Sequence, residues 1–260
     1  MTDIGKSRRL ARLFNKRSGR MFCVPIDHGM QVGSIDGIRD PAPLIDLIVD
    51  AGVDAVIINP GLFAKYSHRF DGGPAVILRL DQTTNWRTGT PFGYSDTHTR
   101  LVANVEDAVQ MGAEGVITYL FTCNNDPAEE TKCFEICGEI GMACRKWGMP
   151  HIIEAMAANG GFAETTDPNV VLMNCRIAGE MGADIIKTDW CGKEGFSKVA
   201  RESLAPVAVA GGSNSGSTKD LMEFVESALD SGAKGIIFSR NVFQRENVAD
   251  TLAQIKSVWS

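Results

Sequence analysis

Lys187 stands near the end of an apolar run, Ala183-Asp184-Ile185-Ile186-Lys187-Thr188-Asp189, that is typical of a buried strand. A lysine held there loses hydration, and desolvation lowers the amine pKa and favours the neutral form, which attacks carbonyl carbon. The run therefore predicts the nucleophile of Schiff-base chemistry, in which an amine condenses with a ketone. For this segment alone, the alternative is a strand-end lysine whose ammonium group extends into water.

Acid–base groups follow other apolar runs. Asp27 and His28 end the first run, Glu154 lies in the fifth, and Asp189 follows Lys187 by two residues. Carboxylates and imidazoles near an amine can move the protons that carbinolamine formation and C–C cleavage require. We expect these four residues and Lys187 to be catalytic. The alternatives left open are that Asp189 or Glu154 pairs with a structural cation and that His28 bonds the backbone.

A second cluster suits phosphate. Ala210-Gly211-Gly212-Ser213 ends the seventh run, and Ser239-Arg240 ends the eighth. Barrels often bind phosphate at these two strand ends, through backbone N–H groups that glycine exposes. Arginine adds a charge-assisted contact. The expected phosphate-binding residues are Gly211, Gly212, Ser213, Ser239 and Arg240.

A repeated sequence motif indicates the helices and strands that position these groups. Gly52, Gly112, Gly182 and Gly232 each follow a helix-like stretch and precede a short apolar run, as in a helix, a tight turn and a buried parallel strand. The candidate strands are Met21–Asp27, Ala55–Asn59, Ala75–Leu80, Gly115–Phe121, His151–Met156, Asp184–Asp189, Pro206–Ala210 and Gly235–Ser239. Candidate helices are Pro41–Asp50, Ala128–Trp147, Pro168–Met181, Thr218–Asp230 and Asn247–Trp259.

This alternation predicts an α/β fold, a single-domain (β/α)8 TIM barrel, with a doubly wound open sheet as the competing architecture. The stretch Phe63–Arg100 is rich in Gly, Thr, Pro and Asn and is interpreted as a long excursion around the third strand. With 260 residues, 44% of them hydrophobic, the chain can bury a large core.

Residues 1–20 form a basic arm with seven Lys or Arg against one Asp, a net +6, whereas the whole chain carries −6 and residues 21–260 therefore −12. The arm also carries Ile4, Leu10, Leu13 and Phe14, so we interpret it as a helix that closes the barrel bottom or contacts a neighbouring subunit. Nucleic-acid binding is the alternative. The barrel is expected to span 21–260.

Seven scattered cysteines indicate a reducing compartment, and we expect a cytoplasmic protein. Cys133, Cys137 and Cys144 fall on one helical stripe and are interpreted as packing rather than as metal ligands. Neither a metal nor another cofactor is predicted. No apolar run reaches transmembrane length, so no membrane partner is expected.

The strand-end motifs together resemble a family. Asp27-His28-Gly29, Ile185-Ile186-Lys187-Thr188, Ala210-Gly211-Gly212 and Arg240-Asn241-Val242-Phe243-Gln244 are similar to the archaeal-type class I fructose-bisphosphate aldolases, and more so to the branch containing the phospho-autoinducer-2 thiolase. The similarity runs from about 19 to about 255. It implies a Lys187 iminium, proton transfer assisted by Asp27, a phosphate held by Gly211, Gly212, Ser213 and Arg240, and a homo-oligomer, often a decamer.

Two departures from the family pattern affect the function. The fructose-bisphosphate aldolases end the fifth strand with a motif whose tyrosine is the acid/base, and this chain has Met156 there, with Glu154 at the motif's tryptophan. We expect Glu154, with a raised pKa, to replace the tyrosine, with Asp27 and Asp189 as the alternatives for this task. Ser239 stands where the family has glycine. The leading prediction is a Schiff-base lyase acting on a phosphorylated ketose. The alternatives are a thiolase-type acyltransferase acting on a phosphorylated diketone, and a non-catalytic phosphosugar-binding barrel.

Overall fold

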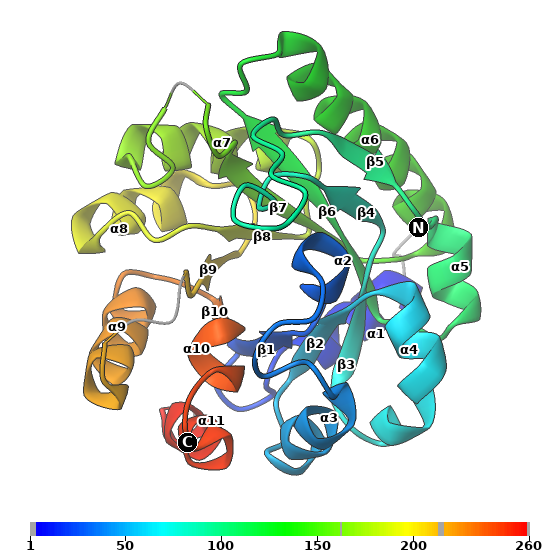
Figure 1. The fold of residues 1–260 in the computed structure, drawn as a ribbon, viewed down its shortest axis with the longest axis vertical. Helices are drawn as coiled ribbons and strands as arrows, with labels where there is room; N and C mark the ends of the chain where they lie inside the picture. The colour runs from blue at the N-terminus through cyan, green and yellow to red at the C-terminus, as the bar shows by residue number, and fades with distance from the viewer. Residues whose placement is uncertain (1–3, 162, 213–215, 259–260) are drawn as a thin grey trace.

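Eight parallel strands close into a barrel in the computed structural model, which describes residues 4–161, 163–212 and 216–258. In ring order the strands are β1 (Met21–Pro25), β10 (Gly235–Ile237), β9 (Val207–Ala210), β8 (Ile185–Thr188), β7 (His151–Ala157), β6 (Gly115–Thr122), β3 (Ala75–Arg79) and β2 (Ala55–Ile58) (Figure 1). Since β1 pairs with both β2 and β10, the sheet has no edge. The predicted TIM barrel is confirmed in all eight strands, and the open-sheet alternative is wrong.

Helices surround the barrel, and local capping explains where several of them begin. The side chains of Asp40, Asp126 and Asp167 each accept a backbone N–H at a helix start that has proline in its first turn. The helices are α1 (Ile4–Leu13), α2 (Gly29–Val32), α3 (Pro41–Asp50), α4 (Pro60–Tyr66), η1 (Ser67–Phe70), α5 (Val105–Gln110), α6 (Pro127–Trp147), α7 (Pro168–Glu180), α8 (Lys193–Glu202), α9 (Thr218–Asp230), α10 (Arg240–Phe243) and α11 (Val248–Ser257).

Two apolar layers form the core. One lies inside the barrel and includes Cys23, Ile57, Ile117 and Ile152, and the other lies between the strands and the surrounding helices. The cysteine stripe of α6 belongs to the second layer, because Cys133, Cys137 and Cys144 are buried with free thiols. The packing interpretation of these three residues is therefore confirmed.

Helix α1 lies against the N-terminal ends of the strands. Leu13 is fully buried in the barrel's interior cluster. Lys6 pairs with Asp184 at 2.8 Å, and Arg12 pairs with Glu114 at 3.0 Å. Asp184 immediately precedes β8, and Glu114 immediately precedes β6. The basic charges of the arm thus neutralise acidic groups of the barrel bottom.

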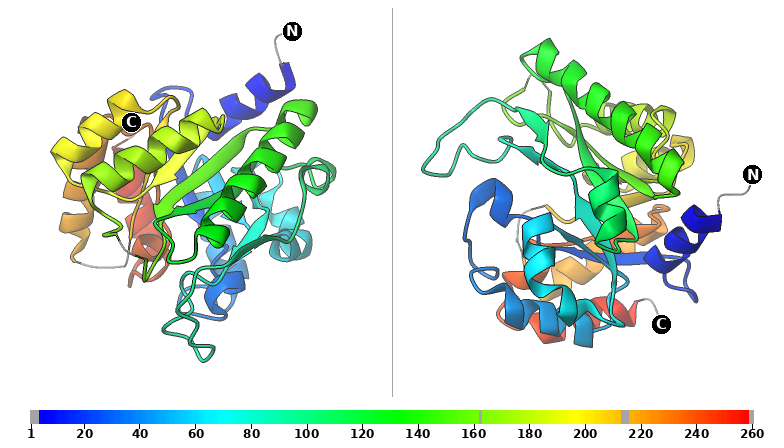
Figure 2. Two further views of the ribbon diagram at one scale, coloured as in Figure 1. Left: turned by 90° about the horizontal axis from the view of Figure 1, so that it is seen from above. Right: turned by 90° about the vertical axis from the view of Figure 1, so that its right-hand side faces the viewer.

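The excursion after β3 contains a hairpin. Strands β4 (Asp81–Thr83) and β5 (Thr99–Leu101) pair antiparallel, outside the barrel. Their connecting loop extends to one side of the barrel in both views of Figure 2. No helix in the described part of the chain is long and apolar enough to cross a membrane.

Candidate active site

Strand register brings three side chains to one level inside the barrel. Tyr119 on β6 pairs in register with Glu154 on β7, and Glu154 with Lys187 on β8. Paired residues of neighbouring parallel strands point to the same face. All three line a cavity of about 680 Å³ at the C-terminal ends of the strands. The fold thus places the sixth-strand lysine in a pocket, as the sequence predicts.

Lys187 is paired rather than extended into water. Its Nζ lies 2.5 Å from Oε1 of Glu154, and its side chain is 11% exposed. The strand-end alternative, an ammonium group extending into bulk solvent, is therefore wrong for this residue. Because the amine faces the cavity, a carbonyl compound entering the pocket can reach it.

Arg79, which no motif of the sequence marks, joins the acidic groups. It is fully buried at the end of β3 and contacts Glu154 at 2.5 Å, Asp27 at 2.9 Å and Asp81 at 3.4 Å. Its guanidinium also lies 3.8 Å from the ring centroid of Tyr119. One signal could have identified it: a buried arginine in an otherwise apolar strand must have charged partners.

The pKa values of Asp27 and Glu154 are both lowered. Burial alone would raise the pKa of each carboxyl, but Arg79 and His28 offset it at Asp27, and Lys187 and Arg79 offset it at Glu154. The expected raised pKa of Glu154 is therefore wrong. A carboxylate held between two cations stays ionised, so Glu154 does not rest as a protonated general acid.

Asp189 has the properties that were expected of Glu154. It lines the cavity, and burial together with the nearby Glu154 raises its pKa to about 6. The pKa of Asp81 is also raised, to about 7 and mainly by burial, but Asp81 is not among the residues that line the cavity. Its Oδ2 instead accepts the backbone N–H of Tyr119 on β6 at 2.7 Å. Among the described carboxylates of the cavity wall, Asp189 is thus the one that titrates near neutrality.

His28 and Tyr119 lie beside the buried carboxylates and make neutral polar contacts there. Burial lowers the pKa of His28 to about 4, so the ring is neutral at pH 7, with Nδ1 3.5 Å from Oδ1 of Asp27. The hydroxyl of Tyr119 donates to Gln31 at 2.9 Å when the Gln31 amide is oriented to donate to the carbonyls of Asp27 and His28. Burial raises the pKa of Tyr119 further above its ordinary value, so its hydroxyl stays protonated.

Most of the predicted phosphate residues line the same cavity, after the ends of β9 and β10. Gly211, Gly212, Ser239 and Arg240 all contribute to the wall, and Ser213 lies outside the described residues. A Cβ on Gly211 would lie 2.8 Å from the Phe238 ring, so only glycine fits there. Nε of Arg240 is buried with no hydrogen-bond partner among the described residues, which leaves a charged donor for an anion.

The described residues contain no group of three or more His, Cys, Asp or Glu side chains arranged to hold a metal ion. The absence of a metal and of other cofactors stays a prediction. The groups present suit covalent chemistry instead: an amine, carboxylates to move protons, and an anion site.

A closed barrel with an amine on the sixth strand, acids beside it and an anion site on the last two strands defines the class of Schiff-base aldolase barrels. Residues 21–245 match the DeoC/LacD family of aldolases, and the chain belongs to this family.

Relatives support the same class. An uncharacterised aldolase of Saccharolobus solfataricus is 31% identical over 255 residues, which cover 96% of this chain and 92% of that protein. The class 1 fructose-bisphosphate aldolase of Thermoproteus tenax is 32% identical over 91% of this chain and 88% of its own length. A solved archaeal fructose-1,6-bisphosphate aldolase, with its catalytic lysine bound to a carbinolamine intermediate, superposes with a TM-score of 0.86 at 27% identity over 97% of this chain and 98% of its own. The protein is a class I aldolase, a lyase that uses a Schiff-base lysine.

Proposed function

We propose that Lys187 is the Schiff-base lysine and that the protein cleaves or forms a C–C bond in a sugar phosphate. One observation carries the assignment: among the described residues that line the cavity, Lys187 is the only lysine. The aldolase of Thermoproteus tenax acts on fructose bisphosphate by its name, which supports a phosphorylated ketose as the substrate class.

We assign roles to the neighbouring groups from their positions. The Nζ of Lys187 attacks the ketone carbon after a proton leaves the amine, and Glu154, at 2.5 Å, is the nearest acceptor. The carbinolamine loses water and becomes an iminium ion. In cleavage, a base removes the proton of the hydroxyl beside the breaking bond, the electron pair of that bond moves into the iminium, and an aldehyde leaves. With a pKa of about 6, Asp189 suits this base, and the enamine is then protonated and hydrolysed.

Borohydride trapping tests the assignment. Dihydroxyacetone phosphate and borohydride should add the mass of the reduced adduct to one peptide, the one containing Lys187. Lys187→Ala should abolish both adduct and turnover, whereas Lys193→Ala, at an exposed lysine of α8, should keep both. An adduct on another lysine, or turnover in the Lys187→Ala protein, would contradict the proposal. Binding without adduct or turnover would favour the phosphosugar-binding barrel.

A thiolase-type acyl transfer on a phosphorylated diketone is the second candidate. Met156 supports it, since a methionine cannot act as the acid/base that the tyrosine provides in the fructose-bisphosphate aldolases. Incubation of a phosphorylated diketone with a thiol acceptor, followed by mass detection of the thioester, distinguishes transfer from cleavage.

The assembly remains a prediction of the family resemblance, and the location remains a prediction of the cysteine content. We propose a homo-oligomer, a decamer, in the cytoplasm, without nucleic-acid or membrane partners. Light scattering of the purified protein gives the mass that tests the decamer.

A further inference from the structure

Two asparagines of the cavity wall hold each other in a fixed orientation. Asn85, which is 4% exposed, lies on the loop after β4, and Asn159 lies on the segment after β7. Oδ1 of Asn85 accepts the backbone N–H of Asn159 at 2.7 Å, and Nδ2 of Asn159 donates to the backbone carbonyl of Asn85 at 3.0 Å. A backbone N–H only donates and a backbone carbonyl only accepts, so these contacts fix which end of each amide faces the other residue.

The opposite atoms of the two amides are left for a ligand. Nδ2 of Asn85 and Oδ1 of Asn159 make no hydrogen bond to any residue that the structure describes, and protein does not enclose either of them. Because both residues line the cavity, these two atoms offer it one neutral donor and one neutral acceptor. A hydroxyl group accepts one hydrogen bond and donates another, so it can satisfy both atoms.

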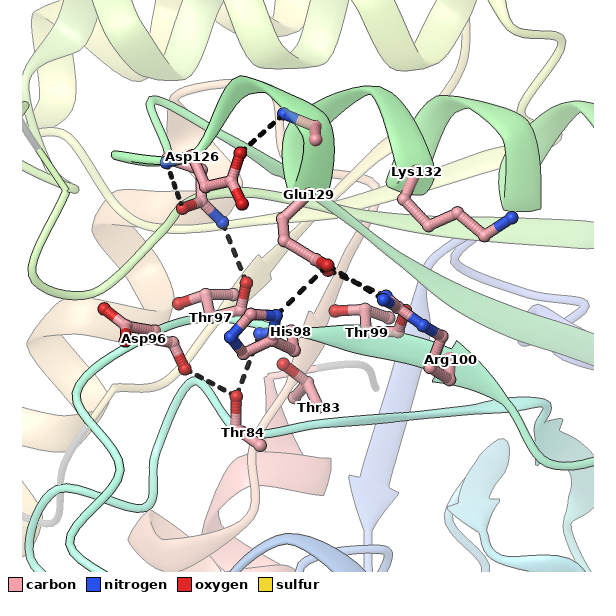
Figure 3. Close-up of polar contacts among 12 residues, drawn as sticks. Thr83, Thr84, Asp96, Thr97, His98, Thr99, Arg100, Asp126, Glu129 and Lys132 are labelled. Carbon is pink, nitrogen blue, oxygen red and sulfur yellow. Dashed lines mark hydrogen bonds and ion pairs between the residues drawn. The ribbon is translucent and has the colours of Figure 1, made fainter.

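The loop that carries Asn85 is attached where it leaves the hairpin (Figure 3). The hydroxyl of Thr84 accepts the backbone N–H of His98 at 2.9 Å, and Asn124 donates to the carbonyl of Thr97 at 2.9 Å. The Thr97 hydroxyl in turn donates to Oδ1 of Asn85 at 2.7 Å. Asn85 is therefore positioned before a substrate arrives, and its hydrogen bond to a substrate costs little ordering entropy.

The segments that carry the two asparagines add neutral groups to the described cavity wall. These are Trp86, Thr88, Gly89, Thr90 and Pro91 from the loop, and Thr165 from the segment after β7. Arg87 of the same loop is not part of that wall, since its Nε and Nη2 donate to the carbonyls of Gln31 and Met30 at 2.9 and 3.1 Å. A phosphate at the asparagine pair would bring its charged oxygens against Oδ1 of Asn159 without gaining a cation there.

The ring order of the barrel places Asn159 on the far side of Lys187 from Arg240. Strands β10, β9, β8 and β7 are successive neighbours, with Arg240 after β10, Lys187 on β8 and Asn159 after β7. In a ketose phosphate cleaved by an aldolase, the carbonyl carbon lies between the phosphate-bearing carbon and the part that leaves as an aldehyde. With its phosphate at Arg240 and its carbonyl at Lys187, such a substrate extends its aldehyde half toward the asparagine pair.

We propose that Asn85 and Asn159 form a hydroxyl-binding subsite for the aldehyde half of the substrate, which is a hydroxyaldehyde without a second phosphate. This inference rests on the proposed function and narrows its substrate class to a ketose monophosphate. In the synthetic direction, the enamine carbon on Lys187 bonds to the aldehyde carbon, the aldehyde oxygen takes a proton and becomes a hydroxyl, and water releases the product from the amine.

A comparison of acceptors tests the subsite. Dihydroxyacetone phosphate serves as the donor, and the acceptors are glyceraldehyde, propanal, which is the same carbon chain without the hydroxyls, and glyceraldehyde 3-phosphate. The wild-type kcat/KM should be at least about tenfold higher for glyceraldehyde than for either of the others, because a site built to bind hydroxyls rejects an analogue without them. A wild-type preference for propanal or for the phosphorylated aldehyde would overturn the inference.

Asn159→Ala removes the acceptor but keeps the backbone N–H that orients Asn85. The kcat/KM for glyceraldehyde should fall by about tenfold, the scale of one hydrogen bond, and the kcat/KM for propanal should not change. Equal losses with both acceptors would mean that Asn159 only supports the loop, and the subsite would be wrong.

Asn159→Lys places a cation at the subsite and should raise the kcat/KM for glyceraldehyde 3-phosphate by at least about tenfold, the effect of a charged hydrogen bond. Gln110→Lys is the matched control, because it adds the same charge at the exposed end of α5, next to the N-terminal end of β6. It should leave all three acceptors unchanged. No gain in Asn159→Lys, or an equal gain in the control, would contradict the placement of the aldehyde half at Asn159.

Trapping separates failure of the subsite from failure of the proposed function. If borohydride traps dihydroxyacetone phosphate on Lys187 but the acceptor preferences are not as expected, only the inference about the asparagine pair is wrong. If no adduct forms on Lys187, the proposed function fails and the inference fails with it. Unchanged trapping in the Asn159 variants shows that they are folded and that their altered preferences arise at the acceptor end.

Discussion

Glu154 contacts Lys187 with one carboxylate oxygen and Arg79 with the other, both at 2.5 Å. The carboxylate is thereby ionised, oriented and kept beside the amine. Arg79 in turn contacts Asp27, so one buried arginine connects the acid groups of β1 and β7. Removing any member leaves a charge without its partner in a buried site, which is costly in free energy.

Glu154→Gln should keep the Lys187 adduct but slow turnover by about 10²–10⁴-fold, the usual contribution of a proton-transfer group. The amide occupies the same space but does not accept the amine proton, so the adduct should form more slowly and still reach one per active site on long incubation with borohydride. The measurement is turnover per active site, with sites counted by borohydride trapping. An undiminished rate combined with lost stability would mean that Glu154 is only an ion-pair partner.

Arg79→Met should lower the free energy of unfolding by about 3–5 kcal/mol, since it leaves buried carboxylates unpaired. Because the pKa values of Asp27 and Glu154 are lowered in the folded protein, their contribution is present above their ordinary values and is lost as the pH falls. The deficit of the variant should therefore shrink below about pH 4.

The control for Arg79 is Arg39→Met, which removes an exposed arginine paired with Asp36. Exposed pairs contribute about 0–1 kcal/mol, so urea denaturation should show little change. If the two variants lose equal stability, the buried network is not held by Arg79.

Asp189→Asn should remove an acidic limb from the pH profile of cleavage. The pKa of Asp189 is raised to about 6, so a required base there gives a rate that rises as the pH passes through 6. In the variant the remaining rate should be low and lack this limb. A limb that persists near pH 6 would assign the titrating base to another residue.

Arg240→Ala should remove about 1.5–3 kcal/mol of binding to a phosphorylated substrate, the scale of a charged hydrogen bond. The KM should rise by about tenfold to a hundredfold. The matched control is the dephosphorylated compound, for which wild type and variant should differ little. If the wild type treats both compounds alike, the anion site is not at Arg240.

Glu129 on α6 accepts two hydrogen bonds from Arg100 on β5 and lies 3.1 Å from Nδ1 of His98. Glu129→Gln should weaken this attachment of the hairpin to α6 by about 1–3 kcal/mol at pH 7. The pKa of Glu129 is lowered from 4.5 to about 2, so its stabilising effect is present above 4.5 and is lost as the pH falls toward 2. The difference in unfolding free energy between wild type and variant should therefore decrease between pH 5 and pH 3. A constant difference would mean that the ionised carboxylate does not hold the hairpin.

The barrel and the strand-end positions of its functional groups could be predicted from the sequence because both depend on local patterns. Gly52, Gly112, Gly182 and Gly232 mark where helices end, the apolar runs after them mark strands, and the geometry of a parallel barrel then gathers the strand ends at one rim. Lys187, Asp27, Asp189 and Arg240 were located in this way. Their expected roles, in contrast, come from the family resemblance.

Tertiary structure alone decided which charges meet. Arg79 and Glu154 are 75 residues apart, and no local pattern reports their contact. An apolar run shows that a carboxyl is buried, which raises its pKa, but only the folded chain shows whether cations offset that burial: they do so at Glu154, and they do not at Asp189. The hairpin also required the fold, because Trp86 lines the cavity only when Asp81–Thr83 and Thr99–Leu101 pair and bring their connecting loop to it.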